Sequence, residues 1–285
     1  MPGATIEDRR NFATTLLSFG WQLARTPRVG DGVLFIRQSI AAFDSLHTQY
    51  PDDVAIARNL ALAYSRLGET LLERTRNWTG ALDAHRKGLD VADRMLKADP
   101  RNSNLVKIVA WARLGVGTAL YELNQLRPAL ASQIAAMDML RSMLELDARN
   151  ETARSDTAYA MSEVGKTLIA LGEPGPARTQ LTESLDILSQ ATGLADTNLT
   201  YNRVLLGVIY VRLGLTHALN ANRPSVTRAE RDKACAEAHH WFALGGPIIT
   251  AGAKADQQWL YLVRDAAEQM TRQAQNCTKA LTVSR

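Results

Sequence analysis

Cysteine is scarce in this chain, with two residues, Cys235 and Cys277, in 285. A chain of this length with so few cysteines is not a disulfide-scaffolded fold. Aromatic residues make up 6%, and there are only nine prolines and 18 glycines, while Ala and Leu are abundant. This balance favours helices over sheets.

Charge of one sign and long hydrophobic runs are also missing. The formal net charge is +4, and basic residues are interleaved with acidic ones, so we expect no nucleic-acid partner. The longest apolar stretch, 204–219, is interrupted by Arg212 and His217 and is too short to span a bilayer. No signal peptide is visible. We therefore expect no membrane insertion and a cytoplasmic location by default, or an extracytoplasmic one within a larger membrane-anchored chain.

Motifs of catalysis are absent as well. We find no P-loop, no G-x-S-x-G and no H-E-x-x-H, and Leu120 stands where a third glycine would follow Gly115 and Gly117. We predict that the chain is not an enzyme and binds no cofactor. One group could suit zinc: Cys235, His239, His240 and Cys277. Because the two adjacent histidines point about 100° apart on a helix, we predict no metal site.

What the sequence does have is an internal repeat of 48 or 49 residues. It is marked by a ladder of five structural glycines, each preceded by an apolar residue: Gly20, Gly68, Gly117, Gly165 and Gly214. A second small residue follows in each unit: Gly32, Ala81, Ala129, Ala177 and, after a longer loop, Ala234. A third small position is occupied by Gly88, Ala136 and Ser184. Such self-similarity indicates a stack of equal structural units.

Each unit is predicted to form two helices. Pro51 and Pro100 stop one helix, and Asp53, Asn102 or Asn150 caps the next. The predicted array spans 1–252, with an insertion at 221–233, and a capping helix and tail occupy 253–285. Its five units are approximately 1–48, 49–98, 99–146, 147–193 and 194–252.

The two ends of the array differ. Gly245-Gly246-Pro247 is predicted to end the last helix of the array. A single helix then follows at 256–281, with these residues on one face: Trp259, Leu262, Val263, Ala266 and Met270. The first unit begins with no capping segment before Glu7, which suggests a further segment upstream.

The pattern Tyr64-x-x-Leu67-Gly68-x-x-Leu71, followed by Ala81, Gly88 and Asp99-Pro100, resembles the tetratricopeptide repeat (TPR), over about 7–244. The resemblance implies an all-α, right-handed superhelical solenoid of about five antiparallel helix hairpins. It also implies a scaffold that binds a peptide or helix of another protein in a concave groove. The long period and the cysteine-bearing last helix further resemble the repeat region behind bacterial serine/threonine kinase domains. That likeness implies an alternative, a sensory or substrate-recruiting arm of such a kinase or its stand-alone relative.

In the TPR family the concave face is lined by residues six and three before the glycine and one and four after it. Transferred to this sequence, these positions give Trp111, Leu114 and Tyr121 in the third unit, and Tyr159 and Lys166 in the fourth. Ten residues before the glycine stand Arg10, Arg58 and Lys107 in three successive units. We therefore expect a partner with an acidic stretch and an apolar anchor near Trp111 and Tyr121.

The two cysteines lie on consecutive predicted helices. A disulfide requires Cα atoms within about 7 Å. If the helix ended at Gly245, Cys235 would lie about 10 residues before that break and Cys277 about 21 after the start of the next helix. A disulfide and two buried thiols are both compatible with the sequence.

Overall fold

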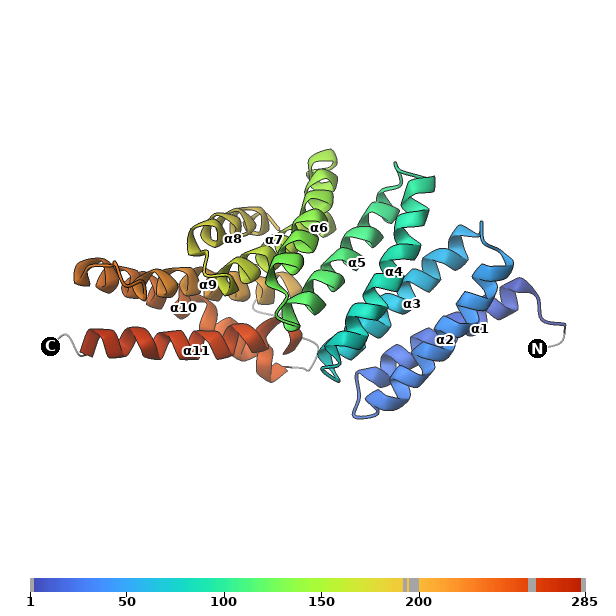
Figure 1. The fold of residues 1–285 in the computed structure, drawn as a ribbon, viewed down its shortest axis with the longest axis horizontal. Coiled ribbons are helices and arrows are strands. Elements are labelled where there is room, and N and C mark those ends of the chain that lie inside the picture. The colour runs from blue at the N-terminus through green and yellow to red at the C-terminus, as the bar shows by residue number, and fades with distance from the viewer. Residues whose placement is uncertain (1–2, 192–193, 195–199, 256–259, 283–285) are drawn as a thin grey trace. The chain divides into compact units, whose positions relative to one another are not determined.

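The computed structural model describes residues 3–191, 194, 200–255 and 260–282. Trp259 lies outside these ranges. The described part contains eleven α-helices and no strand. They are α1 (Ile6–Ala24), α2 (Val29–Gln49), α3 (Val54–Glu73), α4 (Trp78–Ala98), α5 (Ser103–Glu122), α6 (Leu126–Leu146), α7 (Glu151–Ala170), α8 (Pro174–Ser189), α9 (Tyr201–Ala221), α10 (Arg228–Ala255) and α11 (Leu260–Thr282). The chain is all-α, as predicted (Figure 1).

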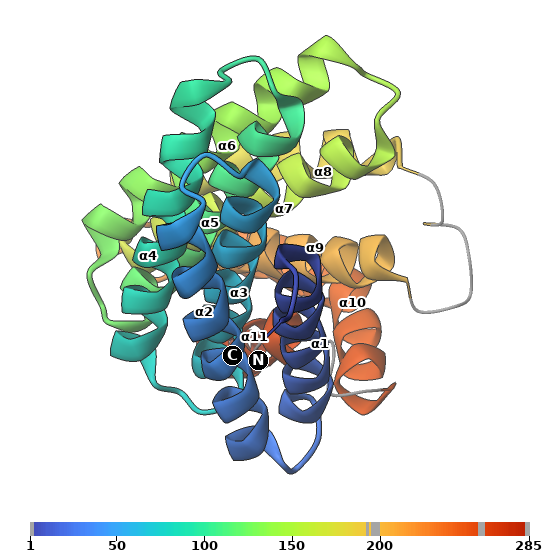
Figure 2. The same cartoon turned by 90° about the vertical axis from the view of Figure 1, so that its right-hand side faces the viewer.

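The chain divides into two compact halves, residues 1–139 and 140–285, with the boundary within α6. We call these halves unit 1 and unit 2; each contains more than one of the repeat units predicted from the sequence. In unit 1, α1 packs against α2 and α3 against α4 as successive antiparallel hairpins (Figure 2). In unit 2, α7 packs against α8, and α9 packs against α10. The TPR-like arrangement of consecutive helix pairs is thus present in each unit. The superhelical handedness stays a prediction.

The predicted caps begin the A helices, a name we give to the first helix of each hairpin. Asp53 Oδ1 accepts from the backbone N–H groups of Ala55 and Ile56 at 2.9 and 3.0 Å. Asn150 Oδ1 accepts from the N–H of Ala153 at 2.9 Å. These bonds satisfy backbone donors that a helix start leaves unpaired, so the unit junctions follow from local sequence.

The ladder glycines lie where the A helix meets its partner helix. A Cβ atom added at Gly20 would come within 2.9 Å of the Gly32 carbonyl oxygen, and one at Gly117 within 3.2 Å of the Ala129 carbonyl oxygen. In the last unit, a Cβ at Gly214 would lie 3.1 Å from the carbonyl oxygen of Ala238. The predicted anchor Ala234 is therefore wrong, and Ala238, one helical turn later, is the contact residue. The insertion adds two turns to the start of α10, which shifts the anchor along the chain.

A second close approach follows seven residues later on each partner helix. Ser184 Oγ donates to the Ala158 carbonyl at 2.7 Å, and a Cβ at Gly88 would lie 3.3 Å from the Ala61 carbonyl oxygen. Gly245 occupies this position in the last unit, where an added Cβ would lie 2.6 Å from the Gly207 carbonyl oxygen. Its small size serves helix packing, so Gly245 is a contact residue within the helix.

The predicted helix end at Gly245 is accordingly wrong. Helix α10 continues through Pro247 to Ala255, so the boundary drawn at residue 253 falls inside it. Proline removes one intrahelical hydrogen bond, the one to the carbonyl of Ala243, and Ala243 is exposed so that water can replace it. Helix α10 is described up to Ala255, 17 residues after Ala238, which is the distance at which α4 ends after Ala81 and α6 after Ala129.

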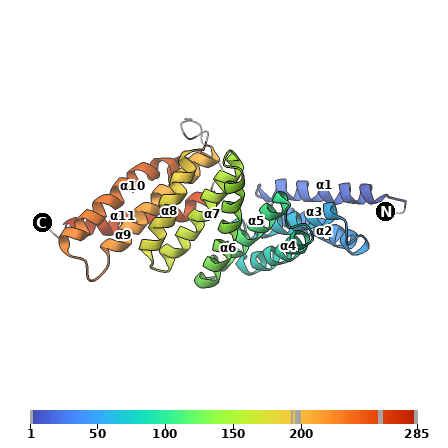
Figure 3. The same ribbon diagram turned by 90° about the horizontal axis from the view of Figure 1, so that it is seen from above.

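Helix α11 packs against both α9 and α10 in unit 2 (Figure 3). Leu262, Val263 and Ala266 are buried, as the predicted apolar face requires.

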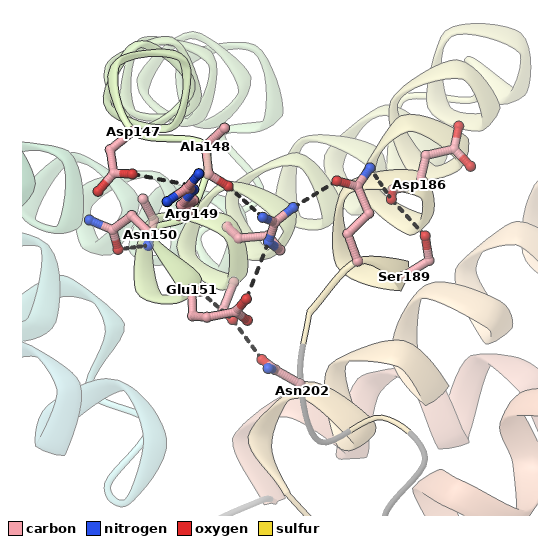
Figure 4. A network of polar contacts seen from close by, with 12 residues as sticks. Asp147, Ala148, Arg149, Asn150, Glu151, Asp186, Ser189 and Asn202 are labelled. Carbon is pink, nitrogen blue, oxygen red and sulfur yellow. Dashed lines mark hydrogen bonds and ion pairs between the residues drawn. The ribbon is translucent and has the colours of Figure 1, made fainter.

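Hydrogen bonds from Arg154 and Ser155, at the start of α7, connect three helices of the same unit. The Arg154 guanidinium donates to Gln190 Oε1 at 2.9 Å and to the Ala148 carbonyl, and Ser155 Oγ donates to Asn202 Oδ1 at 2.7 Å (Figure 4). These bonds tie the entry to α7, the end of α8 and the start of α9 together.

Candidate peptide-binding surface

The A helices of unit 1 are α1, α3 and α5, and those of unit 2 are α7 and α9. We call the side that carries the residues six, three and two before the ladder glycine, and one and four after it, the A-helix face. In unit 1 the Arg66 guanidinium lies 4.2 Å from the ring centroid of Trp21, which follows Gly20. In unit 2 Arg212 Nη2 donates to Glu163 Oε1 at 2.8 Å. Neighbouring A helices thus bring these positions together within each unit.

Four of the five binding residues predicted on α3 and α5 offer side-chain surface. Arg58 is exposed, and Lys107, Trp111 and Tyr121 are partly exposed. Leu114 is only 2% exposed and therefore presents almost no surface to a partner. Tyr121 also packs against the hydrophobic core, which fixes its ring.

A polar cluster that the sequence analysis did not single out lies on α3 in the same unit. Arg66 Nη1 donates to Glu69 Oε2 at 2.8 Å, and Glu73 follows one turn later. Burial raises the pKa of Glu73 to about 8; the charge of Glu69 adds to this rise, and those of Arg74, Arg66 and Arg25 oppose it. Glu73 therefore carries less negative charge near neutral pH than an ordinary glutamate, beside the guanidinium groups of Arg25, Arg66 and Arg74.

The predicted residues of unit 2 are buried. Tyr159 is 9% and Lys166 8% exposed. Lys166 Nζ lies 3.4 Å from Asp265 Oδ2, so helix α11 brings a carboxylate to a lysine of the A-helix face. In this conformation neither Tyr159 nor Lys166 is open to a partner.

A buried ionic cluster surrounds this contact. Arg212 donates through Nη1 to Ser162 Oγ at 2.7 Å as well as through Nη2 to Glu163. Burial by itself would lower the pKa of Arg212, but Glu163, Asp265 and Tyr159 raise it above its ordinary value. An ion pair this deeply buried is retained only when hydrogen bonds satisfy both partners, as they do here.

Asp265 completes the cluster from α11. Burial by itself would raise the pKa of Asp265, but the charges of Lys166 and Arg212 outweigh it and hold the pKa below its ordinary value. Gln269 Nε2, one turn further on, donates to Asp265 Oδ1 at 2.7 Å. Asp265 is thus an ionised carboxylate that faces two cations of the A helices.

Cys235 and Cys277 are joined in a disulfide, with their Cα atoms 5.4 Å apart. The unequal arms expected from the sequence disappear because α10 extends to Ala255. Since both sulfurs are used in this bond, neither is available as a zinc ligand, and the described residues hold no group of three or more metal-ligating side chains. The bond fastens α11 to the first third of α10.

One helix in the described part of the chain, α9, is long and apolar enough to cross a membrane by length and composition. Its apolar window has a mean hydropathy of 1.4 and is 72% buried. The side chains of α9 pack against α7, α8, α10 and α11 within unit 2. This packing accounts for the apolar composition of α9.

Comparison with protein-family models and with curated proteins yields no match. Among solved structures, the chain is similar to BtubC (BKLC) from P. vanneervenii, with 12% identity over 88% of this chain and 91% of that one, and a TM-score of 0.45. It is also similar to a computationally designed self-assembling cyclic homooligomer, with 13% identity over 98% and 97% of the two chains and a TM-score of 0.30.

Proposed function

We propose that the chain is a protein-interaction scaffold that binds a peptide or helix of a partner on the A-helix face of unit 1. The observation that carries this proposal is the side-chain surface that Trp111 and Tyr121 offer on α5, with Lys107 on the same helix and Arg58 on α3. Half-buried aromatic side chains supply rigid contact area, and Arg or Lys beside them attracts carboxylates. The occupant we propose has an acidic stretch and one apolar anchor.

Electrostatics of the neighbouring cluster support an acidic occupant. Glu73, with its raised pKa, contributes less negative charge than an ordinary glutamate, whereas Arg66 is held in place by Trp21 and Glu69. A guanidinium stacked on an aromatic ring keeps donors free for a second carboxylate because Arg carries five N–H groups. The basic character predicted at Arg58 and Lys107 would thus continue along α3.

The test uses peptides selected from a random library against the immobilised chain, with affinities then measured in solution. Arg58→Glu with Lys107→Glu should weaken the selected peptides by about tenfold or more and flatten the salt dependence of binding. A matched control is Lys87→Glu with Arg94→Glu on α4, two exposed cations that pair with acids of their own helix. The control changes the net charge equally.

Equal loss of affinity in both double variants would show that overall charge, and not this face, drives binding. Unaltered affinity in the first variant would remove Arg58 and Lys107 from the surface. The resemblance to kinase-linked repeats suggests a narrower role, a sensory or substrate-recruiting arm of a serine/threonine kinase or its stand-alone relative, and the coding sequence upstream would test this proposal. A kinase domain in frame there would support it.

A further inference from the structure

Helix α11 has the features of a bound ligand. It is amphipathic: Leu262, Val263 and Ala266 are buried, while Arg264 and Glu268 are exposed. Its buried side contacts α9, an A helix, as well as α10 (Figure 1). An amphipathic helix laid against a groove of helices is a recurrent mode of peptide recognition.

The polar contact of α11 has the chemistry that we predict for a partner. Asp265 places a carboxylate 3.4 Å from Lys166, the residue that follows the ladder glycine of α7. Arg212 of α9 lies near enough for its charge to lower the pKa of Asp265. The A-helix face of unit 2 therefore receives one acid from α11, whose buried apolar side belongs to a helix packed against α9 and α10.

A disulfide bond holds α11 against α10. Cys235 lies near the start of α10 and Cys277 near the end of α11, 42 residues apart in sequence, and both are buried. The disulfide holds the end of α11 that is remote from its chain connection to α10. A ligand fastened at both ends competes at a very high effective concentration, so a partner in solution is excluded while the bond is intact.

We propose that the A-helix face of α7 and α9 is a second helix-binding surface, which α11 occupies as an internal ligand and the disulfide keeps closed. Its occupant in trans is an amphipathic helix with a carboxylate in the place of Asp265. This inference rests on the proposed scaffold function and extends it from unit 1 to unit 2. Lys166, buried and paired with Asp265 in the closed arrangement, becomes a contact residue in the open one.

The probe is a fluorescent synthetic peptide with the sequence of residues 260–282 and Cys277→Ser. The open protein is the full chain with Cys235→Ser, Cys277→Ser and Asp265→Asn, which releases the disulfide and weakens the internal helix. We expect this chain to bind the peptide, with the oxidised wild-type chain weaker by on the order of a hundredfold. In the peptide, Asp265→Asn should weaken binding about tenfold, whereas Glu268→Gln, at an exposed position, should leave it unchanged.

Three results would overturn the proposal. The open chain fails to bind the peptide, the two peptide substitutions act equally, or the open chain loses its helical circular dichroism. The last result would show that α11 is part of the core of unit 2. None of these results touches the scaffold function of unit 1, which is measured on the oxidised chain through Arg58 and Lys107. Failure of the two proposals is therefore distinguishable.

Discussion

His85 makes the stability of unit 1 depend on pH in a way that can be calculated. Its imidazole is 3% exposed and lies between two helices, since a Cβ added at Gly68 would come within 2.5 Å of Nε2 and one at Gly115 within 2.5 Å of Cε1. Neither ring nitrogen has a hydrogen-bond partner among the described residues. Burial lowers the pKa of His85 to about 4.

The direction in which stability changes with pH follows from this lowered pKa. The folded protein favours neutral His85, so the stabilisation is complete above the unfolded pKa of about 6.5 and is lost as the pH falls toward 4. Between pH 7.5 and 5 the unfolded state gains a proton that the folded state does not. The free energy of unfolding should therefore fall by about 2 kcal/mol through this residue alone.

His85→Phe is the variant that isolates this effect. Phe keeps a planar ring between Gly68 and Gly115 but cannot titrate, and Phe242 already occupies the corresponding place against Gly214. Urea unfolding at pH 7.5 and pH 5 should show that the variant loses about 2 kcal/mol less than the wild type over this interval. His240→Gln, at an exposed position, should behave as the wild type. Equal losses in the wild type and His85→Phe would refute the reasoning, because they would mean that the folded protein accommodates the imidazolium.

Two further predictions concern cohesion and packing. Leu71 is 4% exposed in the core of unit 1, so Leu71→Ala should lower the free energy of unfolding by roughly 2–5 kcal/mol. Hydrogen exchange should become faster in α3 and α4 and stay unchanged in α7. Equal loss of protection in both units would contradict this prediction. Gly245→Ala should destabilise the protein because its Cβ would press on the Gly207 carbonyl. Gly246→Ala should destabilise it less, because apart from its chain neighbours its Cβ meets only the flexible Met270 side chain, although Pro247 disfavours the helical conformation of a preceding residue that carries a Cβ. Thermal unfolding of the two alanine variants checks this, and equal losses in both would show that Gly245 makes no close contact.

The helical hairpins, their caps and the ladder glycines could be predicted from the sequence because each depends on residues within one period. Gly245 could not be read locally, since Gly-Gly-Pro is a common helix-ending signal. The repeat itself held the better signal. Gly245 stands seven residues after Ala238, as Gly88 stands seven after Ala81, but this register is visible only once the anchor is placed at Ala238. Tertiary packing overrode local propensity at this point.

Binding residues were harder to predict than the fold. The family positions identified Trp111 and Tyr121, which keep side-chain surface, but also Leu114, Tyr159 and Lys166, which are buried in this chain. For Lys166 the difference comes from a helix outside its hairpin, because Asp265 of α11 pairs with it. The helix that brings Asp265 to Lys166 stands about 100 residues later in the chain, beyond the reach of any repeat pattern.

The buried pair of Arg212 and Glu163 shows how far repeat reasoning can be extended. The two residues are 49 positions apart, and both stand two before a ladder glycine. Because A helices of neighbouring hairpins lie side by side, equal positions become neighbours, and opposite charges at equal positions predict an ion pair. One residue after the glycine, the same rule pairs Lys166 with Leu215, which has no charge, and the acid comes instead from Asp265 of α11. A buried cation whose repeat neighbour is apolar therefore indicates a partner from outside the repeat, and on α7 that partner is α11.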